Sequence, residues 1–81
     1  MLFLIEYDRG IGNIITFKKF DDIEREAAEN ARLEMELELN RQGVEHEIVL
    51  LEAETEEALR RTHRRYFENL AELATVPGTS S

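Results

Sequence analysis

Two short apolar runs near the start of the chain predict a β-hairpin. Residues 2–7 are apolar on both alternating faces, a pattern typical of a central strand. Residues 14–20 predict the returning strand, and Lys18 and Lys19 indicate an edge strand because charge discourages pairing with other chains. Residues 8–13 between them contain two glycines and an asparagine, which tight turns favour.

The pattern then changes to one of helical period. Residues 22–41 are rich in strong helix formers, with Asp21 as a candidate N-cap and Gly43 as a plausible stop. The stretch 33–39 alternates like a strand, but it lacks β-branched residues and continues the helical pattern, so we interpret it as helix. The apolar positions of this predicted helix fall on two stripes along its surface, and Leu33 and Leu37 form the second stripe.

A third strand and a second helix complete the pattern. Residues 44–53 predict a strand, apolar on both faces over its second half. Thr55 can cap the helix that follows. Most of the apolar residues of that helix share one face, which carries Leu59, Thr62, His63, Tyr66, Phe67, Leu70, Leu73 and Ala74.

The element order β-β-α-β-α predicts an α+β fold. The first strand is the most apolar, so we place it at the centre of a three-stranded antiparallel sheet of order 3-1-2. Both helices are expected to pack on one face of this sheet. Residues 1–75 are expected to form a single compact domain, and residues 76–81 a flexible C-terminal tail.

Two helices on one face would leave the other face of the sheet uncovered. An exposed apolar patch of more than a few hundred Å² usually marks a contact site. We therefore expect the chain to self-associate as a homodimer, either through a sheet face carrying Leu2 and Leu4 or through Leu33 and Leu37 of the first helix.

Composition removes several kinds of chemistry. There is no cysteine among the 81 residues, which excludes disulfides, Cys-ligated zinc, iron–sulfur clusters and thiol catalysis. No serine precedes Ser80, which leaves no serine nucleophile in the predicted domain. The apolar start stops at Glu6, and no run approaches the roughly 20 residues of a membrane span. We expect a cytoplasmic protein that does not enter the membrane.

Charge is distributed unevenly. The chain carries 18 acidic and 10 basic residues, a net charge of −8, yet residues 58–66 hold four arginines and no acid. This cluster predicts a binding surface for an anionic or protein partner. Its candidate residues are Arg60, Arg61, His63, Arg64, Arg65 and Tyr66. The simpler interpretation is a solvated helix face neutralised by Glu56, Glu57 and Glu68.

The overall negative charge disfavours a nucleic-acid partner, because it repels a polyanion. Two other interpretations stay open. Residues 21–57, with 14 acids against 3 bases, could imitate a nucleic-acid backbone and occupy a basic partner. Alternatively, this acidic region of one subunit could face the arginines of another, although exposed ion pairs contribute little energy.

The two histidines are the remaining candidates for chemistry. Glu45 and Glu47 share one face of the third strand and could offer carboxylates to a metal, but exposed polar side chains explain them more simply, so no metal site is predicted. His46 should point away from both. His63 with Tyr66 defines an alternative function, a small-ligand-binding protein or enzyme with a pocket between the second helix and the sheet.

Three segments carry a resemblance to a family of short, uncharacterised bacterial proteins. They are Glu6-Tyr7-Asp8-Arg9 with Gly12, Leu50-Leu51-Glu52-Ala53-Glu54, and Glu57-Ala58-Leu59-Arg60-Arg61-Thr62-His63-Arg64-Arg65-Tyr66-Phe67. The resemblance covers about residues 3–67 and implies no activity, cofactor or partner. The sequence as a whole predicts a small acidic, non-enzymatic protein-interaction module without a cofactor.

Overall fold

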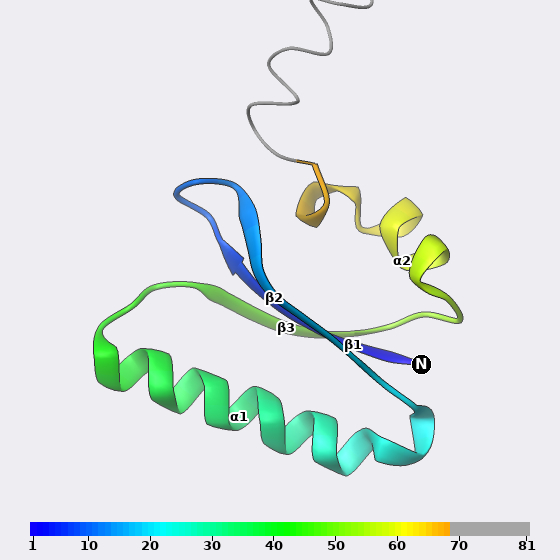
Figure 1. Ribbon diagram of the computed structural model, residues 1–81, viewed down its shortest axis with the longest axis horizontal. Helices are drawn as coiled ribbons and strands as arrows, with labels where there is room; N and C mark the ends of the chain where they lie inside the picture. The colour runs from blue at the N-terminus through cyan, green and yellow to red at the C-terminus, as the bar shows by residue number, and fades with distance from the viewer. Residues whose placement is uncertain (69–81) are drawn as a thin grey trace, which may run out of the picture.

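The computed structural model describes residues 1–68, which form an α+β fold with the predicted β-β-α-β-α order (Figure 1). The strands are β1 (Leu2–Asp8), β2 (Asn13–Phe20) and β3 (Glu47–Glu52). The helices are α1 (Arg25–Gln42) and α2 (Glu56–Thr62), with single 3₁₀ turns η1 (Asp22–Glu24) and η2 (Arg64–Tyr66).

The sheet has the predicted topology. All pairs are antiparallel and the order is β2-β1-β3, so the most apolar strand is central. Ile5 of β1 is paired with Phe17 on one side and with Val49 on the other, which fixes the faces of all three strands. The β1–β2 register shifts between Glu6 and Tyr7, whereas the β1–β3 register runs without a shift.

The β1–β2 connection is a turn built on Asp8. The Asp8 Oδ1 accepts a hydrogen bond from the Gly10 backbone N–H at 2.8 Å, and the Asp8 carbonyl accepts one from the Gly12 N–H at 2.8 Å. Gly12 has φ +72°, a left-handed conformation that glycine adopts without steric cost. The predicted glycine-rich turn is thereby confirmed.

One face of the sheet is covered by the C-terminal elements. Phe3, Ile5 and Tyr7 of β1 form a buried cluster with Leu59 of α2 and Tyr66 of η2. The ring of Tyr7 meets that of Tyr66 edge to face, with 5.2 Å between centroids. Burial of these side chains holds the short C-terminal elements on the sheet.

The opposite face is covered by α1. Leu2 and Leu4 are 2% and 0% exposed, and Ala28 of α1 is also fully buried. A small side chain at that position lets a helix approach a sheet closely. Figure 1 shows α1 along one side of the sheet and α2 on the other.

The prediction that both helices pack on one face is therefore wrong. A central strand that is apolar on both faces needs cover on both, and one helix on each side supplies it. Leu2 and Leu4 lie beneath α1, so the predicted self-association through an uncovered sheet face is also wrong. Leu33 and Leu37 are 51% and 55% exposed.

Element boundaries differ from the predictions in modest ways. The helix predicted over 22–41 begins with η1, and α1 ends at Gln42. Gly43 follows with a φ of +71°, its N–H donates to the Asn40 carbonyl and the Val44 N–H donates to the Leu39 carbonyl, which together form a Schellman motif. The third strand begins three residues later than predicted. Leu70, Leu73, Ala74 and the predicted tail 76–81 lie outside the described residues. Within residues 1–68 no helix combines the length and apolarity that crossing a membrane requires.

Candidate interaction surface

The sheet has two edges, and they differ in character. The β2 edge carries Lys18 and Lys19 and a register shift, both of which discourage pairing with another chain. The β3 edge has an uncharged run, Ile48–Leu51, with an unbroken register. Within residues 1–68 only β1 pairs with β3. The β3 edge therefore lacks the protection that the β2 edge has.

The direction of the backbone groups along β3 follows from one hydrogen bond. The Ala53 N–H donates to the Met1 carbonyl at 3.1 Å, so the pair 1/53 is a hydrogen-bonded pair of the antiparallel ladder. Because such pairs alternate, the odd-numbered residues of β3 bond to β1. Ile48 and Leu50 direct their N–H and C=O groups away from the sheet, and those groups can pair with an added strand.

Helix α1 places apolar side chains beside this edge. Leu33 and Leu37 line a hollow together with Val44 and Ile48. A second hollow follows the edge of β3, where residues from both faces of the strand line it with Arg25, Glu29 and Arg32 of α1. We define the edge surface as Leu33, Leu37, Ile48 and Leu50.

Charges of both signs border the edge surface. Arg25 pairs with Glu52 at 3.1 Å, and Arg32 pairs with Glu36 at 3.2 Å. With Glu29, which also lines the hollow along β3, the border holds two arginines and three glutamates, a much smaller excess of acid than in the whole chain. A border with so small a net charge imposes little repulsion on a second copy of the same surface.

His46 fixes the start of β3 against β1. Its Nδ1 lies 2.6 Å from Glu6 Oε2, and its Nε2 lies 3.4 Å from Asp8 Oδ2. Thr16 of β2 donates a hydrogen bond to the other Glu6 oxygen at 2.9 Å. Glu6 is only 8% exposed, so this carboxylate in an apolar strand is satisfied from both neighbouring strands.

The environment of His46 makes fold stability depend on pH. The hydrogen bond to Glu6, with the charges of Asp8 and Glu6, holds the pKa of His46 above its ordinary value of 6.5. A pKa raised in the folded state contributes stability that is fully present below about pH 6.5 and lost as pH rises through the folded pKa. We expect His46→Gln to lower the midpoint temperature of thermal unfolding more at pH 6 than at pH 9.

Thermal unfolding of the two proteins across this pH range, at equal concentration, checks the expectation. A difference in midpoint temperature between the wild type and the variant that stays constant from pH 6 to pH 9 would show that the charge of His46 contributes nothing to the stability of the fold.

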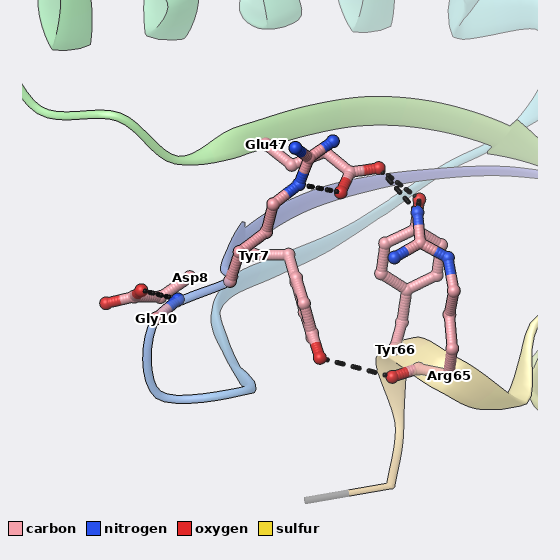
Figure 2. A network of polar contacts seen from close by, with 7 residues as sticks. Tyr7, Asp8, Gly10, Glu47, Arg65 and Tyr66 are labelled. Carbon is pink, nitrogen blue, oxygen red and sulfur yellow. Dashed lines mark hydrogen bonds and ion pairs between the residues drawn. The ribbon is translucent and has the colours of Figure 1, made fainter. Parts of the chain in front are cut away.

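On the other face, Glu47 joins the C-terminal segment to the sheet (Figure 2). Its carboxylate accepts hydrogen bonds from Arg9 at 3.1 Å, from Arg65 at 2.8 Å and from the Tyr66 hydroxyl. The Arg65 guanidinium also lies over the Tyr66 ring, 4.1 Å from its centroid, and the Tyr7 hydroxyl donates to the Arg65 carbonyl at 3.3 Å. These contacts come from β1, the hairpin turn, β3 and η2.

The ionisation of this cluster favours a structural role. Burial raises the pKa of Glu47, but hydrogen bonds from Tyr66, Arg9 and Arg65 lower it by more, so the net shift is downward. Burial and the hydrogen bond to Glu47 raise the pKa of Tyr66. Both groups are held in the protonation states they already have at neutral pH, which is the opposite of what acid–base catalysis requires.

The candidate arginines do not converge on a common site. Each guanidinium pairs with a different glutamate, at 2.9 Å for Arg60–Glu56, 3.9 Å for Arg61–Glu57, 3.3 Å for Arg64–Glu68 and 2.8 Å for Arg65–Glu47. Arg60 also lies over the ring of Phe67, 4.5 Å from its centroid. This arrangement matches the neutralised helix face that the sequence offered as the simpler interpretation.

His63 and Tyr66, the two residues of the predicted pocket, do not line the same hollow beside η2. A hollow beside η2 is lined by Tyr66 and Phe67 with residues of β2 and the hairpin turn, but His63 is not among its lining residues. His63 ends α2, is half-buried, and lies 6.5 Å from Tyr66 between ring centroids. Within residues 1–68 no group of three His, Asp or Glu side chains is arranged so that it could hold a metal ion, and Glu45 is exposed while Glu47 is engaged.

Sequence reasoning missed two anchors. His46 was expected to be an exposed strand residue, and Glu6 was not singled out, yet the two side chains form one part-buried contact. A signal for Glu6 existed, since a single carboxylate inside an otherwise apolar strand requires a partner. Nothing in the sequence indicated which polar residue would be that partner, because His46 lies 40 positions away from Glu6 along the chain.

Comparisons with known proteins add no identity: no family model matches the sequence, and neither a curated protein nor a solved structure shows significant similarity to it.

Proposed function

We propose that this chain is a non-enzymatic protein-interaction module that acts as a homodimer through the edge surface. The observation that carries the proposal is the contrast between the two sheet edges. The β2 edge is blocked by lysines and a register shift. The β3 edge is uncharged over Ile48–Leu51, has a regular register and is continued on α1 by Leu33 and Leu37. Natural proteins protect exposed strand edges unless another chain uses them.

The roles of the ionisable clusters support this class of function. His46 and Glu6 connect β3 to β1, and Glu47 connects β3 to η2. In both clusters the polar atoms already have partners within the chain, and no buried side-chain polar atom among the described residues lacks one. These groups serve to hold β3 in position beside β1, while its other edge is unpaired within residues 1–68.

The proposal is tested by the mass of the full chain in solution. Sedimentation equilibrium over a range from low micromolar to about millimolar concentration should give the mass of two chains at the upper end and approach that of one on dilution. A species with the mass of one chain at every concentration would overturn the proposal.

A further inference from the structure

We propose that two copies join β3 to β3 in antiparallel orientation about a two-fold axis at Val49, forming one continuous six-stranded sheet. This inference rests on the proposed homodimer and adds its register. In this register Ile48 pairs with the partner's Leu50, and His46 stands opposite the partner's Glu52. Three arguments select it.

The first argument is the direction of the backbone groups, which alternates along β3 between β1 and the free edge. Only the even-numbered residues of β3 direct N–H and C=O groups to the free edge, as the Ala53–Met1 hydrogen bond shows. In a new antiparallel ladder, hydrogen-bonded pairs must therefore join even residues to even residues. The register that would pair all six residues of β3 joins Glu47 to the partner's Glu52, an odd to an even residue, and is excluded.

The second argument is charge. Centring the axis on Leu50 places the charged Glu52 opposite Ile48. Centring it on Val49 places Glu52 opposite the polar His46, just before the start of β3, so this carboxylate does not face an apolar side chain. Within its own chain Glu52 is already paired with Arg25, which offsets its charge at the end of the strand.

The third argument is the position of α1. A two-fold axis perpendicular to the sheet places both α1 helices on the same side. Helix α1 contacts β3 and β1, and strands are spaced about 4.8 Å apart. A helix above the gap between those strands would lie about 10 Å from its symmetry mate, which is the usual distance between packed helices. Leu33 and Leu37, on the edge side of α1, would then be covered by the other helix.

The same observations favour a second copy over a partner of another kind. A strongly acidic chain would attract a basic partner through its acidic surfaces, but the border of the edge surface holds two arginines, Arg25 and Arg32, against three glutamates, Glu29, Glu36 and Glu52, and is far less acidic than the whole chain. A two-fold contact uses the same patch on both copies, so a second copy covers the exposed leucines and the free β3 edge of both chains at once.

The absence of cysteine makes the register directly measurable. Val49 would face its own copy in a non-hydrogen-bonded pair, where the Cα atoms lie about 4.5 Å apart, within the range that a disulfide spans. We expect Val49→Cys, equilibrated in a glutathione redox buffer, to form a disulfide-linked dimer in most of the protein. The matched control is Leu51→Cys, on the same face of the same strand. Its two copies would be separated by about four residues of strand, roughly 13 Å, and should stay unlinked.

The outcomes separate the register from the homodimer itself. The mass of each variant is measured first under reducing conditions. If the variants are dimers under reducing conditions, but the disulfide then forms through Leu50→Cys or Leu51→Cys, or through none of these positions, the register is overturned and the homodimer stands. A reduced Val49→Cys protein that folds but has the mass of one chain, together with a monomeric wild type, overturns both.

Discussion

Replacing Leu59 by alanine should lower the free energy of unfolding by about 2–5 kcal/mol. Leu59 is fully buried between α2 and the Phe3–Ile5–Tyr7 face of the sheet, and it is the only fully buried residue of α2. A domain of 81 residues has a total stability of about 4–12 kcal/mol on the usual per-residue scale. The substitution should therefore remove a large share of it.

Urea denaturation followed by circular dichroism, at one fixed protein concentration, measures this loss. The fixed concentration matters because dimerisation adds to the apparent stability. Ile11→Ala is the matched control, since Ile11 is an aliphatic side chain that is 55% exposed in the hairpin turn. A loss at Leu59 no larger than the loss at Ile11 would contradict the placement of α2 on the sheet.

Replacing Leu33 and Leu37 together by glutamate should convert the homodimer to a monomer that keeps its fold. A leucine side chain moved from water into an interface stabilises by about 1.5–3 kcal/mol, and two-fold symmetry counts each substitution twice. The four added carboxylates also repel one another across the axis. We expect the dissociation constant to rise at least about a hundredfold.

Sedimentation equilibrium measures the dissociation constant, and Ile23→Glu provides the control. Ile23 is 94% exposed at the start of the helical segment and lies outside the edge surface, so this variant adds a charge at an apolar site and should remain a dimer. If Leu33→Glu/Leu37→Glu dimerises as tightly as the wild type, α1 does not contribute to the interface.

The fold could be predicted from the sequence as far as local pattern determines it. The alternation in residues 2–7 identified the central strand, and the glycines after Asp8 identified the turn. Leu33–Leu39 is helical despite its strand-like alternation, as its helix-forming residues indicated. The prediction that both helices cover one face overlooked a signal in the sequence, since a central strand that is apolar on both faces needs cover on both. Which helix covers which face could not be predicted, because that depends on how the segment after each strand crosses the sheet.

The candidate site shows a similar division. Leu33 and Leu37 were predicted to need a neighbour, and they are exposed among the described residues. The predicted order 3-1-2 already placed the third strand at an edge of the sheet. This edge was not singled out as a contact surface, because its position beside Leu33 and Leu37 depends on which face α1 covers. The arginine cluster was visible in the sequence, but the pairing of Arg65 with Glu47 depends on η2 folding back onto the sheet.

Amide hydrogen exchange at Ile48 and Leu50 tests the central claim most directly. The same sheet supplies an internal reference, because the ladder alternation directs the amides of Phe17 and Lys19 to the open edge of β2. At a concentration that favours the dimer, the Ile48 and Leu50 amides should exchange at least tenfold more slowly than those of Phe17 and Lys19, and this protection should fall on dilution. Exchange at Ile48 and Leu50 as fast as at Phe17 and Lys19, at every concentration, would contradict the claim that a second copy occupies the edge of β3.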